Sequence, residues 1–135
     1  MANLAFTNAL VTVNGVDLSD QVASVSIEVS ADALDNSAMG DTYRSRIAGP
    51  SDTSWTITFH QDYASSEVSA TLWAAFGTVV TCTVKPVNTT TSATNPLWSQ
   101  SVLVNQITPV SGAYGDLAQV SVTWPGAGTL TQATA

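Results

Sequence analysis

The chain contains very few cations and little charge of either sign. Its 135 residues include three Lys and Arg against ten Asp and Glu, a formal net charge of −7, and only 10% of the residues are charged. Affinity for nucleic acid comes mainly from Lys and Arg that neutralise phosphates, so this balance argues against a protein that grips DNA. Soluble domains usually carry about 25% charged residues. The sparse charge therefore suits a surface that is extensively buried against other subunits.

Cysteine and histidine occur once each. Cys82 has no partner for an internal disulfide, and its place in the strand-like run Val79–Val84 predicts a small buried side chain. A His/Cys zinc site cannot reach four protein ligands. His60 is expected on the outward face of a strand, and no serine or cysteine can be assigned to it as a nucleophile. We therefore predict a protein that is not an enzyme and has no cofactor.

The acidic residues do not form a recognisable metal-binding motif. Asp32, Asp35 and Asp41 are spaced irregularly and do not match the loop of a calcium-binding hand. Some pair of carboxylates could lie at the separation that glycoside hydrolysis needs, but the sequence selects none. Solvated carboxylates in turns are the expected state of these residues.

Long apolar runs are also missing. No run approaches the ~18 residues that would span a bilayer, and the N-terminus lacks the positive region and apolar stretch of a signal peptide. The expectation is a soluble protein without a membrane partner, made in a cytoplasm.

Short alternating segments, typical of half-buried strands, are abundant. The pair Asn14-Gly15 predicts a tight hairpin turn between the first two of them, because both residues readily adopt positive φ. Strands are expected at Leu10–Asn14, Gly15–Leu18, around Val25–Val29, Trp55–Phe59, Thr78–Lys85, Trp98–Ile107 and Gln119–Trp124.

One segment, 65–76, has helical periodicity. Val68, Leu72, Ala75 and Phe76 fall on one arc and Gly77 follows the last of them. Trp73 falls off that arc, so it is expected at the edge of the helix–sheet contact or against a partner. The start could be capped by any of three polar side chains, those of Asp62, Ser65 and Ser66.

Many short strands with one helix predict a mainly β domain, a β-sandwich or barrel with the helix flanking the sheets. The domain is expected to cover residues 1–128. Residues 129–135 are expected to form a short polar tail that is disordered or docks on a neighbour.

A long polar segment follows the third expected strand. It includes both arginines, Arg44 and Arg46, and runs into the strand Trp55–Phe59. A loop of more than about 12 residues inside a compact domain is usually functional or disordered. We therefore expect an arm over about residues 38–50 that contacts another molecule.

Six short segments of the arm and the later chain carry a likeness to a known family: Gly40–Gly49, Trp55–Phe59, Gln61–Tyr63, Thr71–Trp73, Gly115–Leu117 and Val122–Gly126. They follow the order strand, arm, strand, helix, strands, and the likeness runs from about Val13 to Gly128. In this combination the chain resembles the major tail (tail tube) proteins of bacteriophages with long, non-contractile tails.

The resemblance implies a structural virion protein of the tail, made in the host cytoplasm. Such proteins form homohexameric rings whose sheets join into an inner β-barrel, and stacked rings make the tube through which the genome passes. Its partners would be further copies of itself and other tail proteins. DNA would only pass, without specific binding, through an acidic lumen also lined with Ser and Thr.

The arm, Met39–Ile47, is the expected subunit interface. Arg44 and Arg46 suit pairing with carboxylates of an adjacent subunit, while Tyr43 and Ile47 supply apolar contacts. The candidate interface residues are Met39, Asp41, Tyr43, Arg44, Arg46, Ile47 and Trp73. If the arginines are instead solvated, each contributes less than about 1 kcal/mol.

Two other functions remain open. One is a capsid decoration protein or another virion protein with a related sandwich. The second is a glycan-binding sandwich that uses exposed aromatic side chains such as Trp73 or Trp98. Rings or tubes of the purified protein, and a glycan-binding assay, would discriminate among the three.

Overall fold

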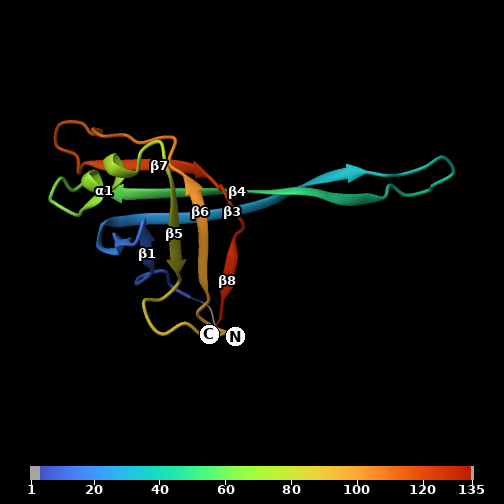
Figure 1. Cartoon of the computed structure of the whole chain (residues 1–135), viewed down its shortest axis with the longest axis horizontal. Coiled ribbons are helices and arrows are strands. Elements are labelled where there is room, and N and C mark those ends of the chain that lie inside the picture. Colours follow the sequence, from blue (N-terminus) through green and yellow to red (C-terminus); the bar gives the residue numbers. More distant parts are fainter. Residues whose placement is uncertain (1–3, 135) are drawn as a thin grey trace.

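The computed structural model describes residues 4–134, which form two antiparallel sheets packed face to face with one helix beside them (Figure 1). One sheet has the strand order β2-β1-β5-β6-β8 and the other the order β3-β4-β7. The elements are β1 (Leu10–Val13), β2 (Val16–Asp17), η1 (Ser19–Gln21), β3 (Val22–Asp35), β4 (Arg46–His60), α1 (Val68–Ala75), β5 (Val79–Lys85), β6 (Leu97–Leu103), β7 (Gln119–Pro125) and β8 (Thr131–Ala133). The predicted β-sandwich with a flanking helix is confirmed.

The first hairpin forms where the sequence predicts it. β1 and β2 pair through Val13 and Val16, and the turn residues Asn14 and Gly15 have φ of 53° and 80°. Two successive positive φ values define the turn whose twist matches a β-hairpin.

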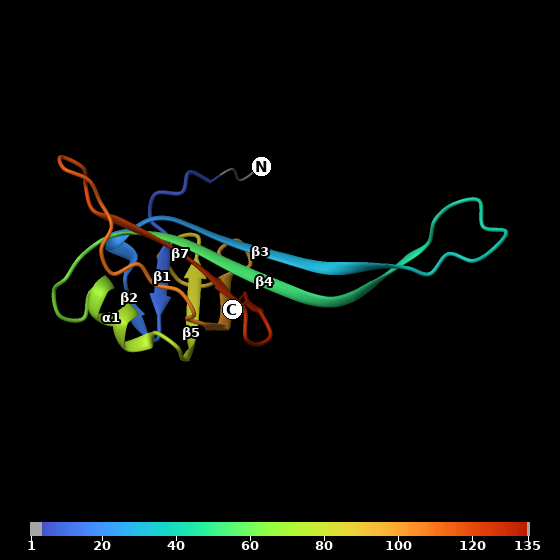
Figure 2. The same cartoon turned by 90° about the horizontal axis from the view of Figure 1, so that it is seen from above.

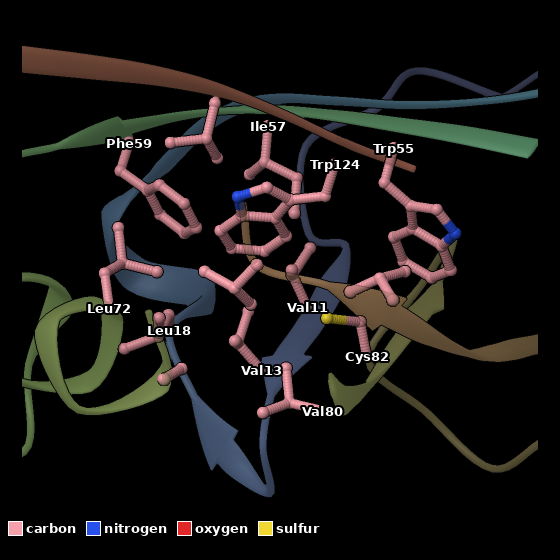
Figure 3. Packing of buried hydrophobic residues seen from close by; sticks show 14 of the residues in the cluster. Val11, Val13, Leu18, Trp55, Ile57, Phe59, Leu72, Val80, Cys82 and Trp124 are labelled. Atoms are coloured by element: carbon pink, nitrogen blue, oxygen red, sulfur yellow. The ribbon is translucent and has the colours of Figure 1, made fainter. Parts of the chain in front are cut away.

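Alternation along the strands builds the core between the sheets. β4 buries Trp55, Ile57 and Phe59, and β7 buries Val120, Val122 and Trp124, all from the three-stranded sheet. Facing them in Figure 3 are side chains of β1 and β5 from the other sheet, including Val11, Val13, Val80 and Cys82. The prediction of a buried cysteine is confirmed, and burial raises the pKa of the Cys82 thiol to about 12, which keeps it protonated.

A buried polar group joins the two sheets. The Oε1 atom of Gln100 on β6 accepts hydrogen bonds from Trp55 Nε1 at 2.7 Å and from Thr53 Oγ1 at 2.8 Å, both on β4. Its Nε2 atom donates to the carbonyl of Gly128 at 2.7 Å. A Cβ atom at Gly126 would overlap Thr53 and Gln100, so glycine is required where the chain passes this group. Gln100 thereby fixes how the sheets align.

The helix differs from its prediction at both ends. It begins at Val68 rather than at residue 65, because Ser66 has a φ of 63° and interrupts helical geometry. None of the three expected caps bonds the helix start through its side chain; Asp62 instead accepts the N–H of Ala64. Phe76 does not join the buried arc: the backbone leaves the helix there, with ψ of 131°, and the ring is half exposed.

Two further boundaries differ from the sequence expectation. β6 ends at Leu103 rather than near residue 107, because Leu103 pairs with Val79, the residue at which the partner strand β5 begins. Residues 131–133 of the expected tail form β8, which pairs with β6 through Leu97, Trp98 and Ser99. Residues 131–133 therefore extend the five-stranded sheet.

Candidate assembly surfaces

The arm is a two-stranded ribbon rather than an irregular loop over residues 38–50. β3 and β4 remain paired as far as Asp35 and Arg46, so only residues 36–45 connect them. The pairing of β7 with β4 ends at Ser54. Beyond that residue, β3 and β4 project from the sandwich as a ribbon of two strands (Figures 1 and 2). Residues 30–35 extend it by roughly 20 Å at about 3.3 Å per residue, before the connecting loop.

A β-bulge twists the ribbon. Ala31 pairs with Ser51 and Ala33 with Ala48, so β4 carries one extra residue at Gly49-Pro50. Proline cannot donate a ladder hydrogen bond and is tolerated in strands at such bulges, which also increase the local twist. A Cβ atom at Gly49 would lie 3.0 Å from the Cβ of Asp32. Figure 2 shows the two strands crossing over in the outer part of the arm.

Hydrogen bonds within the arm organise its tip. Arg44 Nη1 lies 2.6 Å from Asp35 Oδ2 in an ion pair of exposed side chains. The N–H and hydroxyl of Ser37, together with Arg44, hold the pKa of Asp35 below its ordinary value. The carboxylate of Asp41 accepts the N–H of Ala38 at 2.8 Å, and Ser37 accepts the N–H of Ser45. The tip is thus a defined loop.

The two predicted interface arginines have different surroundings. Arg44 pairs with a carboxylate of its own arm, an arrangement that sequence spacing did not reveal. Arg46 is the cross-strand neighbour of Asp35 but makes no ion pair within the described residues. Arg46 is therefore the arginine whose guanidinium remains available to another molecule.

Apolar side chains on the arm face water. Met39 and Tyr43 are 103% and 87% exposed, and Leu34 and Ile47, directly opposite each other in the ribbon, are about half exposed. Exposed apolar side chains gathered on one projecting element are typical of a contact surface. Sequence reasoning identified Met39, Tyr43 and Ile47 but missed Leu34, because the strand's extension was not recognised.

Trp73 lies far from the other predicted interface residues. It is on α1, at the end of the body opposite to the arm in Figure 1, and is 69% exposed. A small depression there is lined by Trp73, Ile107 and Pro109. The predicted interface residues thus form two separate groups, one at each end of the long axis.

The three-stranded sheet has two open edges. β3 and β7 are its outer strands, and among residues 4–134 no strand pairs with their outer sides. β3 presents 14 residues in this way. On β7, the N–H of Thr123 donates to the side chain of Gln106. Unpaired edges are a liability for a monomer and a means of joining another subunit.

The outer face of this sheet is covered by hydroxyl groups. Side chains alternate along strands, so the neighbours of the buried core residues face outward. Across the strands, Thr56 lies 3.4 Å from Thr123 and Thr58 lies 3.3 Å from Ser121, oxygen to oxygen. We call this surface the hydroxyl face; it comprises Ser24, Ser26, Glu28, Ser30, Asp52, Ser54, Thr56, Thr58, His60, Gln119, Ser121, Thr123 and Pro125.

The hydroxyl face carries little charge. Glu28 and Asp52 are its two carboxylates, and His60 lies at the opposite end beside Gln119. The outward position predicted for His60 is confirmed. Most of the chain's acidic residues therefore lie elsewhere.

No helix within residues 4–134 is both long and apolar enough to cross a membrane. In the same part of the chain, no three His, Cys, Asp or Glu side chains gather closely enough to hold a metal ion.

Comparison with known proteins relates this chain to particle components through structure alone. No family model and no curated protein matches the sequence. The fold matches a chain of the sheath/tube terminator of an extracellular contractile injection system (17% identity, TM-score 0.73, 98% of this chain and 97% of that chain). It also matches a chain from the virion of a native gene transfer agent (12%, 0.73, 94% and 96%).

A third match is a chain in the tail of an empty gene transfer agent particle with C6 symmetry (16% identity, TM-score 0.65, 82% of this chain and 81% of that chain). At these identities the likeness establishes the fold, over nearly the full length of the chain. Because contractile injection systems share it, this fold is not restricted to the non-contractile tails that the sequence predicts.

Proposed function

We propose that this chain is a structural subunit that polymerises with itself, as stacked six-membered rings, into the tube of a phage-like tail. The observation that carries the proposal is the part of the β3–β4 ribbon beyond Thr53, which leaves the body with exposed Met39, Tyr43 and Ile47 and contributes nothing to the core. Such an element suits a contact with another subunit. The likeness to chains of tails and injection systems supports the same role.

The open edges suit ring closure. The outer edge of β3 in one copy can pair with the outer edge of β7 in the next, a heterologous contact that closes when the rotation per subunit divides a full turn. The three-stranded sheets then become one barrel, and six copies follow by analogy with the C6 symmetry of one matched tail. The ribbon is left to contact another ring.

In such a barrel the hydroxyl face lines the lumen. Hydroxyl groups have no positive charge that would hold a phosphate backbone, and the carboxylates of Glu28 and Asp52 repel the phosphates. DNA would pass without binding. The acidic lumen expected from the composition becomes, in this proposal, a mostly neutral one, because the acids lie largely outside the hydroxyl face.

The proposal places the protein in a virion tail, in contact with further copies and with other tail proteins. Electron microscopy of the purified protein tests it: we expect six-fold rings or tubes. Monomers or trimers that bind only to capsids would favour a decoration protein, and binding to a glycan array by the exposed Trp73 would favour a carbohydrate module.

A further inference from the structure

A groove opens beside the start of β3, at the end of the body opposite to the arm. Its volume is about 650 Å³. One wall is the N-terminal segment with Phe6, and the other is the open edge of β3 with Val22 and Val25. The groove therefore offers apolar side chains and unpaired strand backbone together. We call it the β3-edge groove.

The β3-edge groove is acidic. Asp17, Asp20 and Glu67 line it, and no Lys or Arg is among its lining residues. Within residues 4–134, none of the three carboxylates forms an ion pair. Partial burial and the nearby charges of Asp20 and Asp62 raise the pKa of Glu67. A cation beside Glu67 and Asp20 would relieve this repulsion.

The arm tip is chemically complementary to this groove. Residues 36–47 contain both arginines of the chain and one acid, Asp41. Arg46 has no ion-pair partner within the described residues, and Tyr43 and Ile47 beside it are exposed. The tip thus combines a cation with apolar side chains, and the groove combines carboxylates with Phe6 and Val25.

The placement of the two surfaces allows them to meet between copies. The arm projects from one end of the body, and the starts of β3 and α1, which carry the groove residues, lie at the other end (Figure 1). Copies arranged head to tail along this axis bring the arm of one toward the groove of the next. Such a heterologous contact repeats without limit, as the growth of a tube requires.

We propose that the β3-edge groove receives the arm tip of a second copy of this chain, with Arg46 facing Asp20 and Glu67. The contact rests on the proposed function, because only a polymer holds two copies in this arrangement. It assigns the groove, at residues 22–25 of β3, to the arm of the next ring and leaves the remainder of the β3 edge and the β7 edge to contacts within a ring.

Charge reversal tests the contact. We expect Arg46→Glu, or Asp20→Arg with Glu67→Arg, to raise the critical concentration for polymerisation on the order of tenfold or more, since facing like charges strongly disfavour an interface. Combining all three substitutions should restore assembly. Asp116→Arg changes an exposed acid outside the groove and should have no effect. Sedimentation and electron microscopy measure assembly, and circular dichroism checks folding.

The outcomes separate this contact from the proposed function. If the wild type forms tubes and Asp20→Arg with Glu67→Arg assembles as readily as Asp116→Arg, the groove assignment is wrong and the tube function stands. If the wild type forms neither rings nor tubes, the proposed function fails, and the contact with it.

Cysteine cross-linking tests the same contact without changing charge. Ser45→Cys at the arm tip with Ala23→Cys in the groove should give a ladder of disulfide-linked oligomers when tubes are oxidised. Ser45→Cys with Ser121→Cys, on the hydroxyl face, is the matched control. Cys82 is buried and stays unreactive. Tubes that yield no more cross-linked product than the control would overturn the assignment.

Discussion

Single residues set the alignment of the two sheets and the charge of the groove. Gln100 receives hydrogen bonds from two side chains of the opposite sheet and has 3% of its surface exposed. Its partners lose their only side-chain acceptor if it is truncated. Partial burial, together with the nearby charges of Asp20 and Asp62, disfavours the charged form of Glu67 and raises its pKa. We therefore expect substitutions of the two residues to have opposite effects on the stability of the monomer.

Gln100→Ala should strongly destabilise the monomer. It leaves Trp55 Nε1 and the Thr53 hydroxyl buried without the acceptor they use, and each such group costs about 1–3 kcal/mol. We expect the free energy of unfolding to fall by roughly 2–5 kcal/mol, measured by urea denaturation. Gln119→Ala, on the exposed hydroxyl face, should change it by less than about 0.5 kcal/mol. Equal effects of the two substitutions would contradict this role of Gln100.

Glu67→Gln should not destabilise the monomer at neutral pH. The folded-state pKa of Glu67 is raised above its ordinary value, so folding loses stability as pH rises through that pKa and Glu67 becomes charged. The side-chain amide of the Glu67→Gln variant does not ionise, so the variant does not lose this stability as pH rises. The variant should melt at the same temperature as the wild type or higher at pH 7, and the difference should vanish below the ordinary Glu pKa. A lower melting temperature of the variant than of the wild type at pH 7 would contradict the upward direction of the Glu67 pKa shift.

Among the elements, the ribbon depends least on the core. Its outer part is exposed, and its pairing beyond Thr53 involves only β3 and β4. The sequence indicated an arm and its anchoring strand Trp55–Phe59 but not the ribbon's length. Strand patterns are recognisable when one face is buried and carries large apolar side chains. Residues 30–35 are exposed on both faces, and only the small side chains of Ala31 and Ala33 continue the alternation. The start of the helix was predicted too early because the sequence does not reveal that Ser66 adopts a positive φ.

Shortening the ribbon should separate folding from assembly. Ala31 and Ser51 are directly paired, so replacing residues 32–50 by Asn-Gly closes a two-residue hairpin at that point. No core residue is removed, and the free energy of unfolding should change by less than about 1 kcal/mol. The variant should remain a folded monomer or isolated ring, judged by urea denaturation and electron microscopy. Stacked tubes of normal length would show that the ribbon is not required.

At the scale of the whole molecule, charge is distributed unevenly. The net charge is −7, yet the hydroxyl face holds only Glu28 and Asp52 among its carboxylates, and the β3-edge groove gathers Asp17, Asp20 and Glu67 at one end. The composition predicted that the electrostatic field of the molecule is negative, but not on which surfaces the acidic residues gather. Location depends on which residues the strand register brings to the same surface.

In the proposed tube, lysines on the hydroxyl face should bind DNA. Thr56→Lys and Ser121→Lys place cations on that face, repeated in every subunit, and phosphate contacts of this kind bind DNA in a salt-dependent way. We expect slower release of DNA from reconstituted particles at low salt, with recovery at high salt. Thr90→Lys, on an exposed loop outside the face, is the control. Unchanged release kinetics would argue that the hydroxyl face does not line the passage.

The sequence by itself determined the β-sandwich, the hairpin at Asn14-Gly15, the buried strands Trp55–Phe59 and Gln119–Trp124, the buried Cys82 and the presence of an arm. These features follow from local φ preferences and from the period of two in burial, which are both written in neighbouring residues. Only the tertiary structure decided that the arm is a twisted ribbon, that Arg44 is paired within it and Arg46 is not, and that three distant carboxylates share a groove. Those features depend on pairing between residues far apart in the chain, and the sequence does not state the register in which they meet.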